Sequence, residues 1–272
     1  MKKIEKTYRT TSGTIHYWIS KAGAEQPWLI FLPGLTADHR LFDRQMADLG
    51  ARFNCLVWDA PAHGASRPFR LDFSLDDLAA YLHKILMYEG VAHSVFVGQS
   101  MGGYIAQAYA MRWPESVDGV ITIDSAPLSR AYYTRAELAL LRHTKALYLA
   151  IPWRLLQCLG ARGCAETSYG RKLMAEMMRS YSKTEYCNLA DHGYRILAEA
   201  VEARESYHLR CPLLLLCGAH DKAASTARYN RMWATREGRQ LVFVPGAGHN
   251  ANTDDPDFID REIEGFLRKI DV

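Results

Sequence analysis

The stretch Ser94-Val-Phe-Val-Gly-Gln-Ser-Met-Gly-Gly-Tyr-Ile-Ala-Gln-Ala-Tyr-Ala110 decides the fold of this chain. It starts with an apolar run typical of a buried strand, passes through a glycine-rich turn, and continues in small residues that favour a closely packed helix. The turn has the pattern G-x-S-x-G, with Ser100 at its centre. So tight a strand-to-helix turn leaves no room for side chains at Gly98 and Gly102. The pattern therefore predicts that Ser100 presents its hydroxyl clear of the backbone, beside the positive end of a helix.

The five-residue pattern alone is weak evidence, because composition produces it by chance in roughly one chain of this length in ten. Its flanks strengthen it. An apolar strand before the turn and a small-residue helix after it are the structural context that a reactive serine requires. We therefore interpret Ser100 as a functional residue and not as an incidental turn serine.

Size and composition restrict the class of protein. The chain has 272 residues, 49% of them apolar and 23% charged, which suits one large α/β domain with an insertion. The net charge of +3 and the lack of a Lys/Arg block argue against a nucleic-acid partner. No apolar run is long enough to span a bilayer, and polar residues from Glu5 on interrupt any signal-like start, so we expect a cytoplasmic protein without a membrane role. The six cysteines show neither a C-x-x-C pair nor zinc spacing, and we expect reduced thiols.

Apolar runs and helical periodicity alternate along most of the chain. The predicted strands are a hairpin at 4–10 and 14–20, followed by runs at 28–32, 53–58, 95–97, 120–123, 212–216 and 240–244. The predicted helices lie near 41–49, 74–88, 101–113, 225–237 and 256–270. This alternation predicts an α/β fold with a mostly parallel, doubly wound sheet.

The alternation stops at residues 128–207, which show helical patterning and no convincing strand. We therefore expect a helical lid inserted into a core formed by residues 1–127 and 208–272. Several large apolar side chains of the lid are candidates to line an acyl pocket, although packing between helices would also explain them. These are Tyr132, Tyr133, Leu140, Leu141, Trp153, Met174, Met177 and Met178.

With these features the chain resembles the α/β-hydrolase superfamily, in particular its lid-bearing, single-domain esterase- and lactonase-like members. The resemblance covers essentially all 272 residues. Its most specific parts are the segments 32–35, 59–66, 98–103 and 246–250. It implies an α/β-hydrolase fold and a Ser-His-Asp triad that works without a cofactor or a metal. It also implies that the 59–66 segment is a structural turn.

The resemblance assigns the catalytic roles in the family's order of nucleophile, acid and histidine. Ser100 matches the nucleophile, which needs a base within hydrogen-bond reach because a serine hydroxyl is weakly acidic. His249, in the glycine-rich segment after the last strand, matches that base. Asp221, which follows the 212–216 strand, matches the acid that orients the imidazole. Asp124 follows the 120–123 strand and stays open as the alternative acid.

The resemblance also places the two backbone N–H donors of an oxyanion hole at Leu35 and Met101. Two departures from the family pattern lie beside them. Pro33-Gly34 stands where relatives usually have His-Gly, which keeps the N–H of Leu35 but removes a histidine side chain. Gln99 stands where many relatives have a histidine before the serine.

A serine at position 100 excludes the relatives that use an aspartate nucleophile, such as haloalkane dehalogenases and epoxide hydrolases. We therefore expect a serine hydrolase acting on an ester-type bond, whether a carboxylester, a lactone or a thioester, of a small and largely apolar substrate. The same fold leaves three alternatives open. They are a carbon–carbon bond hydrolase, an acyltransferase, and a non-catalytic sensor of small molecules.

Overall fold

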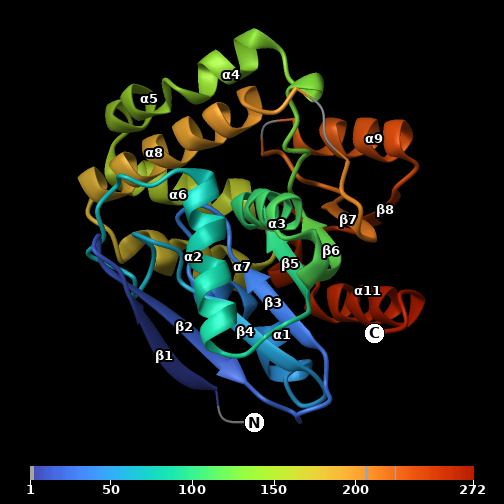
Figure 1. Ribbon diagram of the computed structural model, residues 1–272. Helices are drawn as coiled ribbons and strands as arrows, with labels where there is room; N and C mark the ends of the chain where they lie inside the picture. Colours follow the sequence, from blue (N-terminus) through green and yellow to red (C-terminus); the bar gives the residue numbers. More distant parts are fainter. Residues whose placement is uncertain (1–2, 206–207, 224) are drawn as a thin grey trace.

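A computed structural model describes residues 3–205, 208–223 and 225–272, and shows one eight-stranded sheet surrounded by helices (Figure 1). The strand order across the sheet is β1-β2-β4-β3-β5-β6-β7-β8. The strands are β1 (Ile4–Arg9), β2 (Thr14–Ser20), β3 (Trp28–Leu32), β4 (Asn54–Trp58), β5 (Ser94–Gln99), β6 (Val117–Ile123), β7 (Leu213–Gly218) and β8 (Gln240–Val244). β1 and β2 form an antiparallel hairpin, β2 pairs antiparallel with β4, and the other neighbours are parallel. The predicted mostly parallel, doubly wound sheet is therefore confirmed.

Helices of the core cover this sheet. They are η1 (His39–Phe42), α1 (Asp43–Asp48), α2 (Leu75–Tyr88), α3 (Met101–Arg112), η2 (Pro114–Ser116), α9 (Thr226–Glu237), α10 (Ala251–Asp254) and α11 (Pro256–Lys269). α2 packs on α3, and α1 packs on α11. As the sequence predicts, α11 begins at Pro256 with an aspartate cap, because the carboxylate of Asp255 accepts the N–H of Phe258 at 3.0 Å.

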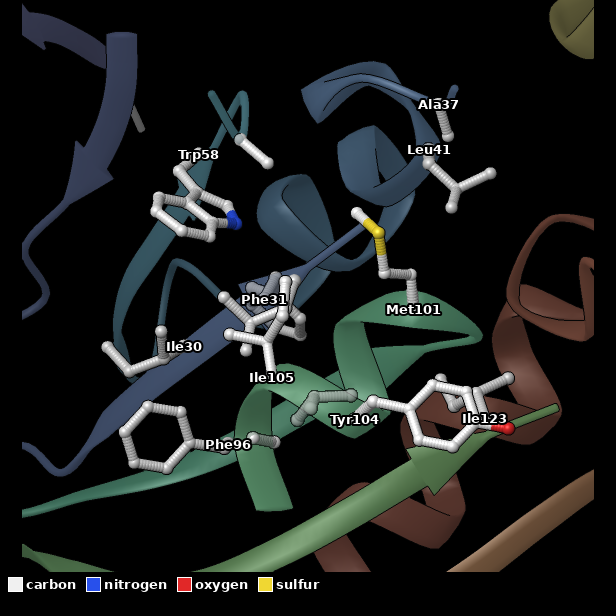
Figure 2. Close-up of a cluster of buried hydrophobic side chains, with 14 of the residues drawn as sticks. Ile30, Phe31, Ala37, Leu41, Trp58, Phe96, Met101, Tyr104, Ile105 and Ile123 are labelled. Atoms are coloured by element: carbon white, nitrogen blue, oxygen red, sulfur yellow. The ribbon is translucent and has the colours of Figure 1, made fainter. Parts of the chain in front are cut away.

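Residues 98–102, the serine turn, join β5 to α3. The hydrophobic core between β3, β5 and α3 fixes the position of this turn (Figure 2). Phe31, Phe96 and Ile105 come from these three elements and are fully buried. Burying each such side chain stabilises the fold by about 1.5–3 kcal/mol relative to leaving it in water. The small residues of α3 let its backbone lie close to the sheet, so the end of β5 and the start of α3 are held in one rigid unit.

The structure differs from the sequence expectation at several boundaries. The helix expected at 41–49 is divided into η1 and α1, because the side chain of Asp38 accepts the N–H of Arg40 and starts a tight turn there. β5 and β6 extend beyond their apolar centres, since backbone pairing continues through polar residues such as Gln99. The short helix α10 was not expected from the sequence.

Helices occupy the region between β6 and β7. They are η3 (Arg130–Tyr132), α4 (Arg135–Leu141), α5 (Thr144–Ala150), α6 (Trp153–Cys164), α7 (Ser168–Arg179) and α8 (Lys183–Glu202), and no strand occurs among the described residues of this region. α6 packs on α7, while α4 and α5 pack on α8 (Figure 1). That residues 128–207 act as a separate lid stays a prediction. No described helix of the chain combines the length and the apolar character needed to cross a membrane.

Candidate active site

Ser100 occupies a strained turn between β5 and α3. Its backbone has φ 49° and ψ −115°. Residues other than glycine rarely adopt such a positive φ, which costs about 1–3 kcal/mol. Two hydrogen bonds hold this conformation: the N–H of Ser100 donates to Ile123 O at 2.9 Å, and Ser125 Oγ donates to Ser100 O at 2.7 Å. The turn therefore holds Ser100 in a fixed backbone conformation between the end of β5 and the N-terminus of α3.

The glycines of the turn are required by close backbone contacts. A Cβ at Gly98 would lie 2.4 Å from the backbone of Gly102, and a Cβ at Gly102 would lie 1.8 Å from Leu32 O. Both contacts are with backbone atoms, which cannot move aside as a flexible side chain can. The expected reason for the G-x-S-x-G pattern thus agrees with the packing of the turn.

His249 and Asp221 lie together beyond the ends of β8 and β7. His249 Nδ1 is 3.1 Å from Asp221 Oδ2, and the other carboxylate oxygen accepts the N–H of Ala223 at 2.7 Å. The Asp221 side chain is fully buried, and that of His249 is 12% exposed. A buried carboxylate at Nδ1 favours the tautomer in which Nε2 is free to accept a proton.

Asp124, the alternative acid, makes different contacts. One carboxylate oxygen accepts the N–H of Gly218 at 2.6 Å, and the other accepts the N–H of Ala251 at 3.1 Å. Asp124 thus ties the end of β7 to the segment after His249. Among the described residues, Asp221 and not Asp124 makes the hydrogen bond to the imidazole.

The charges of the two aspartates act on each other and on the histidine. Burial acts to lower the pKa of His249, but the charge and hydrogen bond of Asp221, together with the charge of Asp124, outweigh it and raise that pKa. Burial, followed by the charge of Asp221, raises the pKa of Asp124 well above its ordinary value. The site therefore favours the imidazolium form of His249 more than water does.

Gln99, which directly precedes Ser100, joins three parts of the site. Its Nε2 donates to His249 O at 2.8 Å and lies 3.3 Å from Asn250 Oδ1. Its Oε1 lies against Gly34, where an added Cβ would be only 2.2 Å from it. Gln99 is one of the departures from the family pattern in the sequence. It holds residues 246–250, the histidine segment, next to the serine turn.

The two residues predicted to supply oxyanion donors belong to segments that contact the serine. Met101 is the first residue of α3, so its N–H precedes the hydrogen-bond ladder of the helix. A Cβ at Gly34 would be 3.1 Å from Ser100 Cβ, which places the 33–38 loop against the serine. Within the described part of the chain, no backbone hydrogen bond uses the N–H of Leu35.

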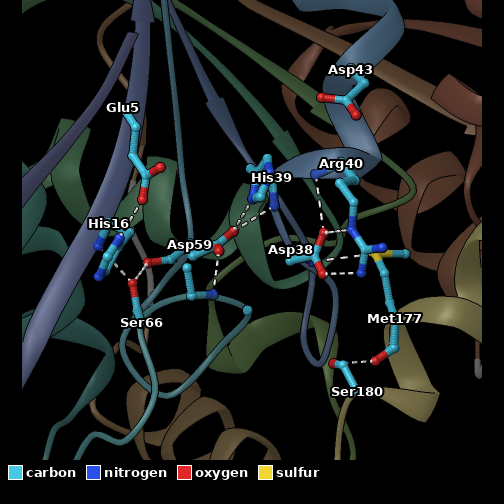
Figure 3. A network of polar contacts seen from close by, with 12 residues as sticks. Glu5, His16, Asp38, His39, Arg40, Asp43, Asp59, Ser66, Met177 and Ser180 are labelled. Carbon is cyan, nitrogen blue, oxygen red and sulfur yellow. Dashed lines mark hydrogen bonds and ion pairs between the residues drawn. The ribbon is translucent and has the colours of Figure 1, made fainter. Parts of the chain in front are cut away.

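The 33–38 loop lacks the histidine of many relatives and is braced from its far end (Figure 3). Asp59 Oδ1 accepts the N–H of His39 at 2.6 Å, and Oδ2 accepts the N–H of Ala65 at 2.6 Å. The N–H of Asp38 donates to Met177 Sδ of α7 at 3.4 Å. The 59–66 turn therefore supports the loop structurally, as the family resemblance implies.

The hydroxyl of Ser100 has no hydrogen bond to His249 among the residues that the structure describes. Catalytic hydrogen bonds often tighten only when substrate is bound. The structure brings His249 and Asp221 into contact, and the Gln99 contact brings this pair to the serine turn. The roles of all three residues remain predictions.

Parts of the helical insertion contact two segments of the site, the histidine segment and the 33–38 loop. Met174 Sδ lies 4.0 Å from Asn250 Nδ2, and Leu35 packs on α8 at Gly193, where a Cβ would be 2.4 Å from Leu35 Cδ1. Of the other candidates for an acyl pocket, Tyr132 donates to Glu237 of α9, and Leu140 is 69% exposed. Packing and solvent exposure therefore explain these last two.

Two of the surface hollows formed by the described residues lie away from these side chains. One of about 540 Å³ is formed by the 9–14 hairpin and residues 68–70, and one of about 170 Å³ lies between the 62–71 loop and α8. Neither is lined by Ser100, Asp221 or His249. An acyl pocket beneath the insertion stays a prediction.

Two clusters among the residues that the structure describes have the residue types of metal ligands, but hydrogen bonds already use their oxygens. In the first, Asp38 pairs with Arg40 and Asp59 accepts two backbone N–H groups. The second cluster contains the two aspartates beside His249 together with Cys217, and the four carboxylate oxygens there each have a donor. Both clusters are therefore explained as hydrogen-bond networks.

Comparison with known proteins agrees with this geometry. The profile of the Alpha/beta hydrolase family matches residues 29–262, which is most of the chain. The chain therefore belongs to this family, and it is an enzyme of the hydrolase class.

Individual relatives are distant in sequence. The chain is 25% identical over 248 residues to the Escherichia coli O103:H2 (strain 12009 / EHEC) protein named "Putative carbamate hydrolase RutD", covering 86% of this chain and 88% of the relative. The structure of the present chain is similar to that of a thermophilic esterase from Thermogutta terrifontis (TM-score 0.77, 21% identity, 99% of both chains covered). It is also similar to the enol-lactonase from Burkholderia xenovorans LB400 (TM-score 0.76, 21% identity, 97% of this chain and 100% of that one). At these identities the two structures support the shared fold alone.

Proposed function

We propose that this enzyme is a serine hydrolase that cleaves an ester-type bond of a small, largely apolar substrate through an acyl-enzyme. Ser100 attacks the carbonyl carbon while His249 takes the hydroxyl proton, and Asp221 orients the imidazole and stabilises its charged form. The N–H groups of Leu35 and Met101 stabilise the oxyanion of the tetrahedral intermediate. His249 returns the proton to the leaving group, and water then cleaves the acyl-enzyme by the same route.

The observation that carries the proposal is the contact between the serine turn and the histidine segment. Gln99 is adjacent to Ser100 and bonds to His249 O, while His249 Nδ1 faces the buried carboxylate of Asp221. Contacts thus link the serine turn, the imidazole and the buried acid, which come from three separate strand ends. A weakly acidic hydroxyl needs a base nearby in order to act as a nucleophile, and these contacts support His249 in that role.

The choice of bond is supported by analogy with relatives. One similar structure is an esterase and another is an enol-lactonase, and both names describe acyl transfer from an ester oxygen to water. The relative named for carbamate hydrolysis is similar over most of the chain, so a carbamate carbonyl is a second candidate electrophile for Ser100.

We further propose that the lid formed by residues 128–207 selects the acyl group. Met174 and Met177 contact the histidine segment and the 33–38 loop. The rings of Trp153 and Tyr186 are tilted relative to each other at a centroid distance of 5.3 Å, and the side chain of Tyr186 interacts with that of Thr36. Large apolar side chains of the insertion thus reach the two loops between which an acyl chain would lie.

The experiment that tests this proposal is a hydrolysis screen of carboxylesters, lactones, thioesters and carbamates with graded acyl lengths. Wild type and Ser100→Ala are compared on every compound. We expect hydrolysis of at least one ester-type class by the wild type and none above background by the variant. Hydrolysis of none of the carboxylesters, lactones and thioesters by the wild type would contradict the proposal, and hydrolysis of carbamates alone would favour the second candidate electrophile.

A further inference from the structure

The backbone on both sides of His249 is bound to one turn of the helical insertion. This turn, residues 164–167, joins α6 to α7. The N–H of Asn250, which follows the histidine, donates to Cys164 O at 2.6 Å. The N–H of Gly248, which precedes it, donates to Asp254 Oδ2 at 2.8 Å, and Asp254 in turn binds the same turn.

Asp254 has a donor for each lone-pair direction of its carboxylate. Oδ2 accepts the N–H groups of Gly248 and Glu166, the latter at 2.9 Å. Oδ1 accepts both the N–H of Thr167 at 2.9 Å and its hydroxyl at 2.7 Å. Hydrogen bonds to an ionised carboxylate are about twice as strong as neutral ones, so this is a firm link between two segments distant in the sequence.

Close packing accompanies these hydrogen bonds. A Cβ at Gly170, in the first turn of α7, would lie 3.0 Å from Asp254 Oδ1 and 2.9 Å from Thr253 Oγ1. A Cβ at Gly248 would lie 3.3 Å from Cys164 O. The histidine segment and the 164–167 turn therefore have little freedom to move relative to each other.

We propose that Asp254 is a positioning residue for His249, and that through it the 164–167 turn of the insertion sets the position of the imidazole. The inference rests on the proposed role of His249 as the base. The sequence suggests only that Asp254 lies near the start of α11. The structure assigns it instead to the contact between the insertion and the histidine segment.

Positioning of the base affects the chemical step more than substrate binding. An imidazole displaced by a fraction of an ångström still leaves the acyl site intact, but it loses alignment with the serine hydroxyl. A misplacement of about 1 Å reduces rates by roughly 100-fold in well-studied enzymes. Loss of the Asp254 link should therefore lower kcat and slow modification of Ser100, with little change in KM.

The test compares Asp254→Asn with Asp255→Asn, which makes the same chemical change one residue further on. The asparagine at 254 retains one acceptor oxygen and points N–H groups at the remaining donors, so it loses two of the four hydrogen bonds. Asp255 caps α11, where asparagine is an equally good cap. The readouts are kcat and KM on a hydrolysed ester, the rate of labelling by a fluorophosphonate probe, and thermal unfolding.

We expect Asp254→Asn to lower kcat and the labelling rate by roughly 10–100-fold with KM changed by less than about threefold, while Asp255→Asn resembles wild type. A lower Tm with unchanged kcat and labelling would show that Asp254 only stabilises the fold, and would overturn the inference. If the wild type is neither active nor labelled, the proposed function itself fails. That result is distinguishable from an active wild type whose Asp254→Asn variant is equally active.

A second pair of variants decides the matter if Asp254→Asn does not fold. Thr167→Val removes one of the four hydrogen bonds of Asp254 and also the N-cap bond that the Thr167 hydroxyl accepts from the N–H of Gly170, and Thr167→Ser retains the hydroxyl for both. Both keep the N–H donor. We expect Thr167→Val to lower kcat severalfold and Thr167→Ser to keep kcat near the wild-type value, whereas equal kcat values for the two variants would overturn the inference.

Discussion

Replacement of Asp221 by asparagine is the substitution whose consequence follows most directly from the geometry. One carboxylate oxygen accepts the N–H of Ala223 at 2.7 Å, and the other faces His249 Nδ1 at 3.1 Å. Because the N–H of Ala223 can only donate, the amide oxygen of the new side chain should stay on it. The amide NH2 then faces His249 and donates to Nδ1.

That reversal determines the size of the effect. With Nδ1 as an acceptor, Nε2 carries the proton and cannot take one from Ser100. The same change of tautomer in a serine protease lowers kcat by about 10⁴. We expect a similar loss here, which corresponds to about 5 kcal/mol in the activation barrier.

Asp124→Asn is the matched control, because it makes the same change in a neighbouring buried carboxylate. Its oxygens accept the N–H groups of Gly218 and Ala251, so the variant loses one acceptor and should be destabilised by about 1–3 kcal/mol. Its kcat should fall by less than about tenfold, since the imidazole keeps its partner. The assay is steady-state kinetics on a hydrolysed ester together with thermal unfolding. A larger loss of kcat in Asp124→Asn than in Asp221→Asn would refute the assignment of the acid.

Three further predictions concern pH, stability and selectivity. Burial lowers the pKa of His249, but Asp221 outweighs this effect and the pKa is raised. Because the base must be neutral to accept a proton, kcat/KM should fall as the pH decreases through an apparent pKa above that of an ordinary histidine. A pH profile of kcat/KM that stays flat down to pH 5 would contradict this expectation. Burial raises the pKa of Asp260 to about 6, so ionisation of this carboxyl group destabilises the fold at higher pH. Asp260→Asn should therefore increase the free energy of unfolding by about 1–3 kcal/mol at pH 7.5 but not at pH 4. Equal changes at both pH values would refute burial of the Asp260 carboxylate as the cause. Trp153→Ala should shift the preferred acyl length of the substrate without altering probe labelling of Ser100. The change in kcat/KM should correspond to about 1–3 kcal/mol of activation free energy per methylene group. Altered labelling with an unchanged length preference would indicate that the insertion covers the site without selecting the acyl chain.

Much of the fold could be predicted from local sequence patterns. Strands buried on both faces, such as Trp28–Leu32, are continuous apolar runs because the side chains after Trp28 are all buried. The G-x-S-x-G turn is equally legible, since backbone contacts at Gly98 and Gly102 forbid side chains. Strand ends were less predictable, because pairing depends on the neighbouring strand and continues through polar residues such as Gln99.

The site was predictable where chemistry restricts the residue type, and not where long-range contacts decide. The sequence indicated Asp221 as the partner of His249 and left Asp124 open, and the structure shows why both carboxylates are buried there: they use different donors. Gln99 and His249 are 150 residues apart, and Asp254 and Thr167 are 87 apart. Their residue types fit many surface roles, so no pattern in the chain distinguishes them as links.

Covalent modification tests most directly whether Ser100 is an activated nucleophile. The protein is treated with a fluorophosphonate probe, digested, and mapped by mass spectrometry, with Ser100→Ala and His249→Ala treated in parallel. We expect one stoichiometric adduct on Ser100 in the wild type, none in Ser100→Ala, and strongly slowed labelling in His249→Ala, because the hydroxyl is unreactive without a base. Equal labelling of wild type and Ser100→Ala, or a stoichiometric adduct on another residue, would contradict the account.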